Sequence, residues 1–233
     1  DERRPAIYKG CILFEQIEAV ADDIHALGKL TMGNGVPGAF CWLVGLIDVM
    51  GTETNWHRDG RWQPMSDEQM IYRRALAGGK PYCFLMNTVF EDLNEDLVER
   101  YMKRSLAYGM FPGFFSHNAS EGHFFNRPEL YNRYRPLLKR YVPLCRRVAE
   151  AGWEPITLAH SDNPKVHVER FGNRCLTVLN DSDEPQTATV QLDGITANRT
   201  ADLMTGREVT WPSARTTITL AAEDVAVLDL QAE

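Results

Sequence analysis

A carboxylate and an indole lie three residues apart in the segment LIDVMGTETNW at 46–56. The apolar run at 46–50 is typical of a buried strand, and we expect the chain to turn at Gly51. Glu53 and Trp56 would then leave the tip of one strand together. A carboxylate can transfer a proton and an indole can stack on a sugar ring, so this tip is the first candidate site. An ordinary loop, with Glu53 in solvent and Trp56 capping the core, would give the same pattern.

Helical and strand patterns alternate along the first 160 residues. Ser66–Gln69 reads as a capping box, Asn94 as a second N-cap, and Gly28 as a C-cap, while Pro136 and Pro143 should break or kink the last helix. We expect helices over 15–28, 66–78, 94–109 and 128–151, and strands over 29–35, 46–50, 81–87 and 110–116. Parallel strands need helical crossovers, so this order predicts a parallel α/β fold.

Polar side chains follow each of these strands. Asn34 and Asn87 end two of them, and Ser116, His117 and Asn118 end the last. In parallel α/β folds, ligands bind at the carboxyl ends of the strands. We therefore expect Asn34, Glu53, Asn87 and His117 to meet at one edge of the sheet.

The pattern changes near residue 161. Beyond the turn at 161–164, short β-branched runs alternate with turns, and no helical pattern interrupts them. The sequence predicts two domains: an α/β domain over 1–160 and an antiparallel β-sandwich over 161–233, with the boundary between 158 and 166.

The composition excludes some classes of partner. The net charge of −7 argues against nucleic acid. No apolar run approaches the roughly 18 residues of a membrane span. The five cysteines lack metal-ligand spacing, and we expect neither a metal nor another cofactor. The first residues do not form a signal peptide, which leaves the cellular location open.

An α/β unit followed by a β-sandwich resembles the C-terminal half of a (β/α)8-barrel glycoside hydrolase, distantly like the α-galactosidase and α-N-acetylgalactosaminidase group. The phrases that carry the resemblance are DVMGTE at 48–53, KPYCFLMN at 80–87, YGMFPGFF at 108–115 and DLMTGREV at 202–209. The resemblance implies hydrolysis of an O-glycosidic bond with two carboxylates. In such enzymes the nucleophilic aspartate follows the fourth barrel strand, and the acid/base carboxylate often follows the sixth.

On this resemblance, the strands that end at Asn34, Glu53, Asn87 and Ser116 would be the fifth to the eighth. Glu53 is the expected acid/base, desolvated by Trp56, and Asp48 is the second candidate carboxylate. Carbohydrate is the expected substrate. The expected subsite consists of ring-contacting side chains (Trp56, Trp62 and His57) and hydroxyl-binding side chains (Asn34, Asn87, His117 and Asn118).

Two other functions stay open. A non-catalytic carbohydrate-binding or assembly module would keep the aromatic tips without a nucleophile. A metal-dependent hydrolase could use Asp48, His57, His117 and His123, although these lack a local ligand pair. About four βα units cannot close an eight-stranded barrel. We therefore expect a homo-oligomer, or an N-terminal half of the same polypeptide, to complete it.

Overall fold

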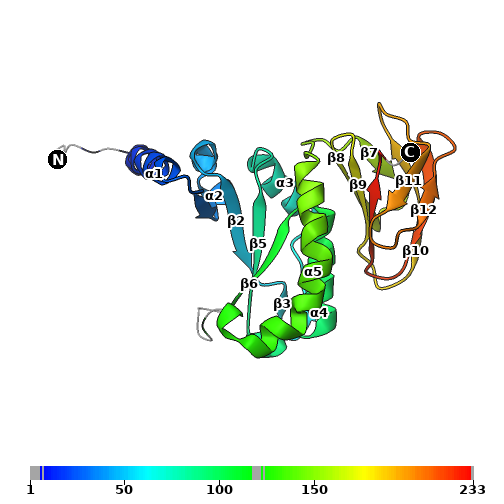
Figure 1. Cartoon of the computed structure of the whole chain (residues 1–233), viewed down its shortest axis with the longest axis horizontal. Coiled ribbons are helices and arrows are strands. Elements are labelled where there is room, and N and C mark those ends of the chain that lie inside the picture. Colours follow the sequence, from blue (N-terminus) through cyan, green and yellow to red (C-terminus); the bar gives the residue numbers. More distant parts are fainter. Residues whose placement is uncertain (1–5, 7, 117–121, 123, 232–233) are drawn as a thin grey trace, which may run out of the picture.

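The computed structural model describes residues 6, 8–116, 122 and 124–231. Figure 1 shows helix α1 at one end, a parallel sheet with its helices in the middle, and antiparallel strands at the other end. The chain thus has an α/β part followed by a β part, which confirms the order that the sequence predicts.

A four-stranded parallel sheet forms the centre of the first part. Its strands, in spatial order, are β1 (Met32–Asn34), β2 (Val49–Thr54), β5 (Tyr82–Thr88) and β6 (Phe111–Ser116). All three neighbouring pairs are parallel, so the carboxyl ends of the strands share one edge. Among the described residues, β1 and β6 each pair on one side only.

The strand that carries Glu53 differs from the prediction. Residues 41–46 form the 3-10 helix η1 (Cys41–Leu46), and β2 starts only at Val49. It then continues through Gly51 to Thr54, so the predicted turn at Gly51 is wrong. A Cβ at Gly51 would lie 2.6 Å from Cε of Met32. The glycine therefore makes room for a neighbouring side chain instead of turning the chain.

Three helices cover one face of this sheet: α3 (Asp67–Leu76), α4 (Glu95–Ala107) and α5 (Pro128–Glu150). The predicted caps are confirmed: Ser66 and Gln69 form the capping box of α3, and Oδ1 of Asn94 accepts the backbone N–H of Leu97 at 2.9 Å. Shorter helical turns lie between the strands: α2 (Val36–Ala39), η2 (Phe90–Asp92) and η4 (Phe124–Asn126).

Helix α5 runs unbroken through both of its prolines, contrary to the prediction. Pro136 and Pro143 are both exposed and lie seven residues apart, on the side of α5 that faces water. Carbonyl groups that lose their helical partner on this side can be hydrated, which lowers the cost of each proline.

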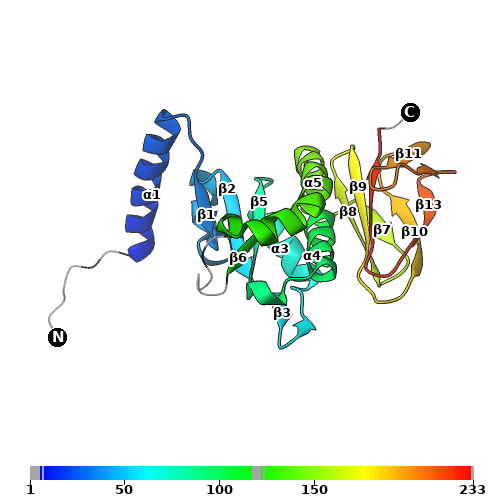
Figure 2. The same ribbon diagram turned by 60° about the horizontal axis from the view of Figure 1, so that its bottom comes forward.

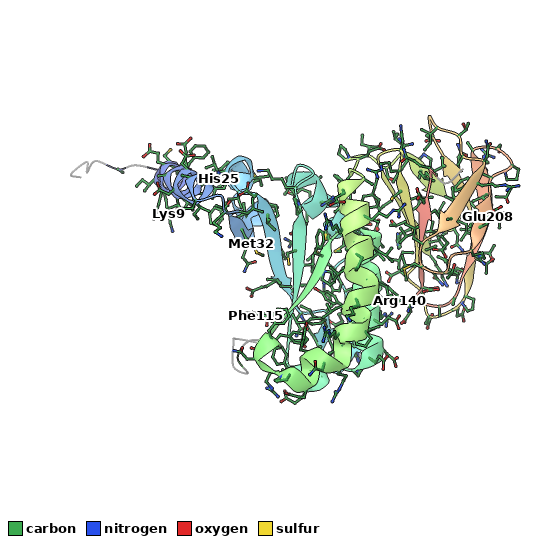
Figure 3. All side chains as sticks on the ribbon, viewed as in Figure 1. Lys9, His25, Met32, Phe115, Arg140 and Glu208 are labelled. Atoms are coloured by element: carbon green, nitrogen blue, oxygen red, sulfur yellow. The ribbon has the colours of Figure 1, made fainter. Side chains whose placement is uncertain are left out.

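The opposite face of the parallel sheet carries half-exposed apolar side chains. Cys83 and Leu85 of β5 lie on it, while the alternate residues Tyr82 and Phe84 are buried under the helices. Met32 of β1 and Phe115 of β6 belong to the same face by register, and Figure 3 shows both on the side away from α5. The described residues thus leave one broad apolar face of the sheet uncovered.

The β part contains two antiparallel sheets. One has three strands, β13 (Arg215–Leu220), β10 (Gln186–Leu192) and β7 (Ala159–Ser161). The other has five: β12 (Glu208–Thr210), β11 (Arg199–Asp202), β14 (Val225–Asp229), β9 (Cys175–Asn180) and β8 (Val166–Phe171). Side chains of both sheets form one hydrophobic cluster. Over 166–231 the structure contains no helix.

The two parts pack together through α4. Arg104 Nη1 lies 2.5 Å from Asp181 Oδ2, and Thr177 donates its hydroxyl to the carbonyl of Ala107 at 2.6 Å. Gly109 follows α4 at φ +65°, and a Cβ there would lie 2.5 Å from the ring of Phe171. The glycine thus permits both the left-handed turn and the close approach of β8.

Helix α1 (Lys9–Ala26) stands apart from the sheet, as Figure 2 shows, and it contacts mainly η1. Ala21 is its only fully buried residue, whereas Ile12 and Val20 are exposed. Within the described part of the chain, no helix has the length and apolar character needed to cross a membrane.

Candidate functional site

Glu53 is held by two asparagines at the carboxyl edge of the parallel sheet. Asn34 of β1 donates its amide N–H to Oε1 of Glu53 at 2.7 Å, and Asn87 of β5 donates to Oε2 at 3.1 Å. Three neighbouring strands thus bring together three side chains that the sequence predicts for the site.

The strand register explains this convergence. Asn34 pairs with Gly51, two residues before Glu53, and Leu85 pairs with Glu53, two residues before Asn87. Residues two apart on a strand point to the same face. The three side chains therefore follow a diagonal across the uncovered face, close enough for the amides to reach the carboxylate.

The carboxylate lines an open cavity with a volume of about 610 Å³. This cavity lies over the ends of β1 and β2. Its lining residues are Asn34, Gly35, Gly38, Ala39, Thr52, Glu53, Tyr72 and Arg73. The volume lies within the range of 300–1,000 Å³ that small-molecule sites have.

Asp48, the second candidate carboxylate, lies away from this group. It precedes β2, whereas Glu53 lies near the end of that strand, so about 16 Å of extended chain separates them. Catalytic carboxylates of glycosidases lie roughly 5–10 Å apart. The structure therefore does not support a catalytic pair of Asp48 and Glu53.

Asp48 instead has a structural environment. Its Oδ2 accepts the backbone N–H of Thr31 at 2.8 Å and the Thr31 hydroxyl at 2.9 Å, and it lies 2.8 Å from Nε2 of His25. The backbone N–H of Thr31, followed by the bond from His25, holds the pKa of the Asp48 carboxyl far below its usual value. These contacts fasten the end of α1 to the start of β2.

Trp56 lies in the core, as in the alternative in which it belongs to an ordinary loop. Its side chain is 1% exposed and packs against Phe84 and Tyr101, with ring centroids 4.8 and 5.3 Å away. The chain turns after β2 and carries the indole into the core beneath α4. Trp56 therefore contacts neither Glu53 nor the cavity, and it cannot stack on a ligand there.

Trp62 and His57 lie on a short hairpin, β3 (His57–Arg58) and β4 (Arg61–Trp62). Trp62 packs edge-on against Trp56 and under the guanidinium of Arg100, so it also packs against the hydrophobic core. Nδ1 of His57 lies 3.2 Å from Oδ2 of Asp92, which joins the loops after β2 and β5. His117 and Asn118 lie outside the described residues.

Metal ligands do not gather in the described part of the chain. No three His, Cys, Asp or Glu side chains converge there on one point, and this includes Asp48 and His57. His117 and His123 lie outside the described residues.

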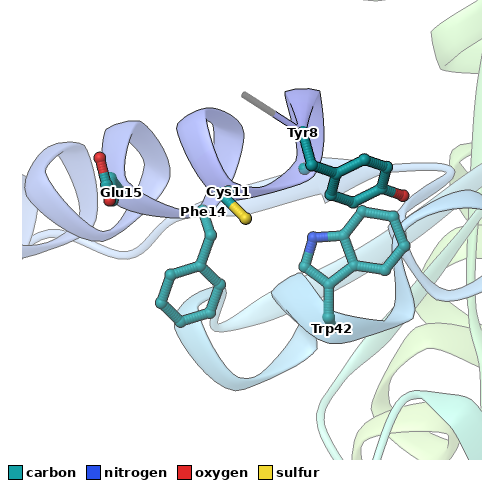
Figure 4. A pocket seen from close by; sticks show the side chains of 6 residues that line it. Tyr8, Cys11, Phe14, Glu15 and Trp42 are labelled. Atoms are coloured by element: carbon teal, nitrogen blue, oxygen red, sulfur yellow. The ribbon is translucent and has the colours of Figure 1, made fainter. Parts of the chain in front are cut away.

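A second cavity of about 340 Å³ lies between α1 and η1. Figure 4 shows Tyr8, Phe14 and Trp42 around it, with Cys11 and Glu15 from α1. Half of its lining residues are aromatic, and none of them is Glu53 or one of the two asparagines.

Three residues near the carboxyl edge are absent from the sequence prediction. Tyr72 and Arg73 reach the cavity from α3, and Asp92 contacts His57 from the loop after β5. The helical pattern of 66–78 marks Tyr72 and Arg73 only as helix residues. Nothing local indicates that α3 places them beside the end of β2.

Comparison with known proteins finds similar structures but no similar sequences. No protein-family model matches the sequence, and no curated protein matches it. Solved structures do match. Alpha-galactosidase I from Mortierella vinacea superposes with a TM-score of 0.52 at 11% identity, over 96% of this chain and 64% of that chain.

An alpha-amylase from Anoxybacillus matches with a TM-score of 0.55 at 9% identity, over 94% of this chain and 56% of that chain. A GH30 endoxylanase from Clostridium papyrosolvens C71 matches with a TM-score of 0.49 at 11% identity, over 97% and 61%. The chain resembles glycoside hydrolases in fold. It spans less than two thirds of the length of each of these structures.

Proposed function

We propose that this chain carries part of the active site of a glycoside hydrolase, with Glu53 as the acid/base. In this proposal the parallel sheet belongs to a (β/α)8 barrel, and the antiparallel sheets form a β-sandwich. The observation that supports it most directly is the clamp of Asn34 and Asn87 on Glu53, at the edge of a sheet where ligands bind.

Glu53 would act on the oxygen of the scissile bond. In its protonated form it would donate a proton to the departing oxygen, and in a retaining mechanism it would then take a proton from the incoming water. The two amides fix the direction of the carboxyl group. The ring of the bound sugar would occupy the cavity beside Glu53.

A second carboxylate has to come from elsewhere, because Asp48 is too distant. The free edges of β1 and β6 offer two places where further strands could pair. Such strands, from a second copy of the chain or from another segment of the polypeptide, would bring the nucleophile or the base to the opposite side of the sugar.

The test is Glu53→Gln in the natural gene product, assayed on a panel of aryl glycosides. The amide keeps the shape but cannot transfer the proton, so we expect kcat/KM to fall about 10²–10⁴-fold with folding unchanged. Glu208→Gln, on the exposed strand β12, is the matched control and should keep full activity. Near-complete activity of Glu53→Gln would dismiss this role. Binding of glycosides without any turnover by the parent protein would instead indicate a non-catalytic carbohydrate-binding module.

A further inference from the structure

Arg73 brings a positive charge to the cavity beside Glu53. It lies on α3, and its guanidinium makes two hydrogen bonds: Nε to Sδ of Met65 at 3.1 Å, and Nη1 to the hydroxyl of Thr52 at 3.2 Å. Both acceptors are neutral. Among the described residues, no carboxylate lies within 4.0 Å of this guanidinium, and none accepts a hydrogen bond from Nη2.

Other arginines that are buried or partly buried have carboxylate partners. Arg104 pairs with Asp181 at 2.5 Å, Arg170 with Glu154 at 3.0 Å, and Arg100 with Glu223 at 2.7 Å. Arg74 is the buried exception, and it donates to the carbonyl of Lys80 and lies over the ring of Trp153. Arg73 differs from all of these because it lines an open cavity with its charge unmatched.

The surroundings of Arg73 suit a saccharide. Tyr72, on the same wall, is 59% exposed and offers a ring face for stacking. A Cβ at Gly38 would lie 3.4 Å from Nη1 of Arg73, so the backbone of α2 passes close to the guanidinium. The group is thus confined between α2 and α3, which favours a fixed orientation.

Arg73 and Glu53 reach this cavity from opposite faces of β2. Thr52, which holds Arg73, points toward α3, and its neighbour Glu53 points to the other face of β2. Both side chains line the cavity because it lies over the ends of β1 and β2. A ligand that contacts the carboxylate of Glu53 can therefore extend toward the guanidinium without the two groups neutralising each other.

We propose that this cavity binds a saccharide that carries an anionic group, and that Arg73 recognises this group. The planar guanidinium can donate two parallel hydrogen bonds to a carboxylate or a sulfate, which a neutral hydroxyl cannot match. The ligand class is an acidic sugar, either a uronic acid or a sulfated sugar. The saccharide itself rests on the proposed function, whereas the anionic group rests on Arg73.

The test titrates the 1–233 chain with glucose, galactose, glucuronic acid, galacturonic acid and glucose 6-sulfate, followed by NMR chemical shifts. We expect an acidic sugar to bind about tenfold more tightly than its neutral counterpart, and high salt to reduce the difference. Comparison of the uronic acids with glucose 6-sulfate shows whether the recognised group is a carboxylate or a sulfate. Equal Kd values for acidic and neutral sugars would overturn the proposal.

Arg73→Gln should remove the preference for acidic sugars, and Arg73→Lys should retain only part of it, because a lysine keeps the charge without the fork. Arg199→Gln, which removes one charge from the β part, is the matched control and should keep the preference. Should Arg73→Gln fail to fold, Arg73→Lys carries the test, because an undiminished preference in that variant would exclude recognition by the guanidinium fork. A preference that survives loss of the guanidinium contradicts the proposal.

The outcomes separate this inference from the proposed function. A preference for acidic sugars that persists in Glu53→Gln, with no hydrolysis by the gene product, would support the role of Arg73 and refute that of Glu53. Hydrolysis of neutral glycosides that is lost in Glu53→Gln, with no preference for acidic sugars, would do the reverse.

Discussion

Within the described residues, the carboxylate of Glu53 uses about half of its hydrogen-bonding capacity. An ionised carboxylate has about four acceptor sites, and Asn34 and Asn87 use one on each oxygen. Oδ1 of Asn87 is buried without a partner among the described residues. An unmatched buried acceptor costs about 1–3 kcal/mol. The contact that orients the Asn87 amide is therefore the one from its N–H to Glu53.

Asn87→Ala should lower kcat of the gene product about tenfold or more and change KM little. The amide orients the carboxyl group, and misplaced catalytic groups lose rate before they lose binding. Steady-state kinetics on an aryl glycoside measures both constants. Asn132→Ala, at an exposed position of α5, is the control and should match the parent protein. A rise in KM with unchanged kcat would instead mean that Asn87 binds the sugar.

Asp48→Asn should destabilise the fold and leave the site intact. The pKa of Asp48 is depressed in the folded protein, chiefly by the backbone N–H of Thr31, so its contribution is present above the usual value of 3.8 and is lost as the pH falls below it. We expect the variant to melt at a lower temperature than the parent at pH 7, and the difference to shrink below about pH 4. Thermal denaturation followed by circular dichroism across this range checks it. A difference that is constant with pH would contradict the assignment.

At the scale of elements, local signals were predictable and long-range burial was not. The caps at Ser66 and Asn94 involve contacts three residues apart, so the sequence contains all of the information. The place of Trp56 depends on Phe84 and Tyr101, which lie far along the chain. Similarly, Glu53, Asn34 and Asn87 were predictable because strand ends in parallel folds meet at one edge.

Other elements escaped prediction because their sequence signal is weak or shared. Strands β7 and β12 have three residues each, too few for an alternating pattern. Gly51 has the sequence mark of a turn, but only the position of Met32 on β1 reveals that it lies within a strand. Residues on α3 that reach the cavity share their pattern with those that merely face solvent.

The junction between the two parts contains a buried acid. Glu169 of β8 is 4% exposed, and burial, reinforced by the charge of Asp67 on α3, raises its pKa to about 8. Asp67 also accepts the hydroxyl of Tyr108 and lies 3.3 Å from Nδ1 of His167. Near pH 7 the Glu169 carboxyl is therefore mostly protonated.

Glu169→Gln should alter the dependence of stability on pH. In the unfolded chain Glu169 ionises near 4.5, and in the folded protein near 8, so the folded state binds more protons between these values. The free energy of unfolding of the parent should fall with rising pH in this window, by at most about 1.4 kcal/mol per unit from this group. The variant should lose this component. Urea denaturation at several values from pH 5 to 9 measures it, and parallel curves for both proteins would contradict it.

At the scale of the whole molecule, the uncovered face of the parallel sheet predicts association with another chain or segment. Half-exposed Leu85 and Phe115 lie on that face, and within the described residues the outer edges of β1 and β6 are unpaired. Exposed apolar patches and unpaired edges bind other chains. The described residues offer no cover for this face, and a second copy or another segment of the polypeptide could supply it.

We expect the purified 1–233 chain to self-associate in light scattering. Phe115→Lys should reduce the association, because it places a charge on the uncovered face, whereas Ile156→Lys, at a position that is already exposed elsewhere, should not. A stable monomer of the parent chain at high concentration would contradict this expectation.

Helix α4 limits how freely the β part could be exchanged in evolution or by engineering. Its basic side chains pair with carboxylates from the β part: Arg100 with Glu223, Lys103 with Asp224 and Arg104 with Asp181. The carbonyl of Ala107 takes the hydroxyl of Thr177. A chimaera that grafts a foreign β domain onto this sheet would have to reproduce these partners, since otherwise three cations of α4 would lose their carboxylates. The contacts with α4 thus tie this β part to this parallel sheet, and another β domain could replace it only with matching partners.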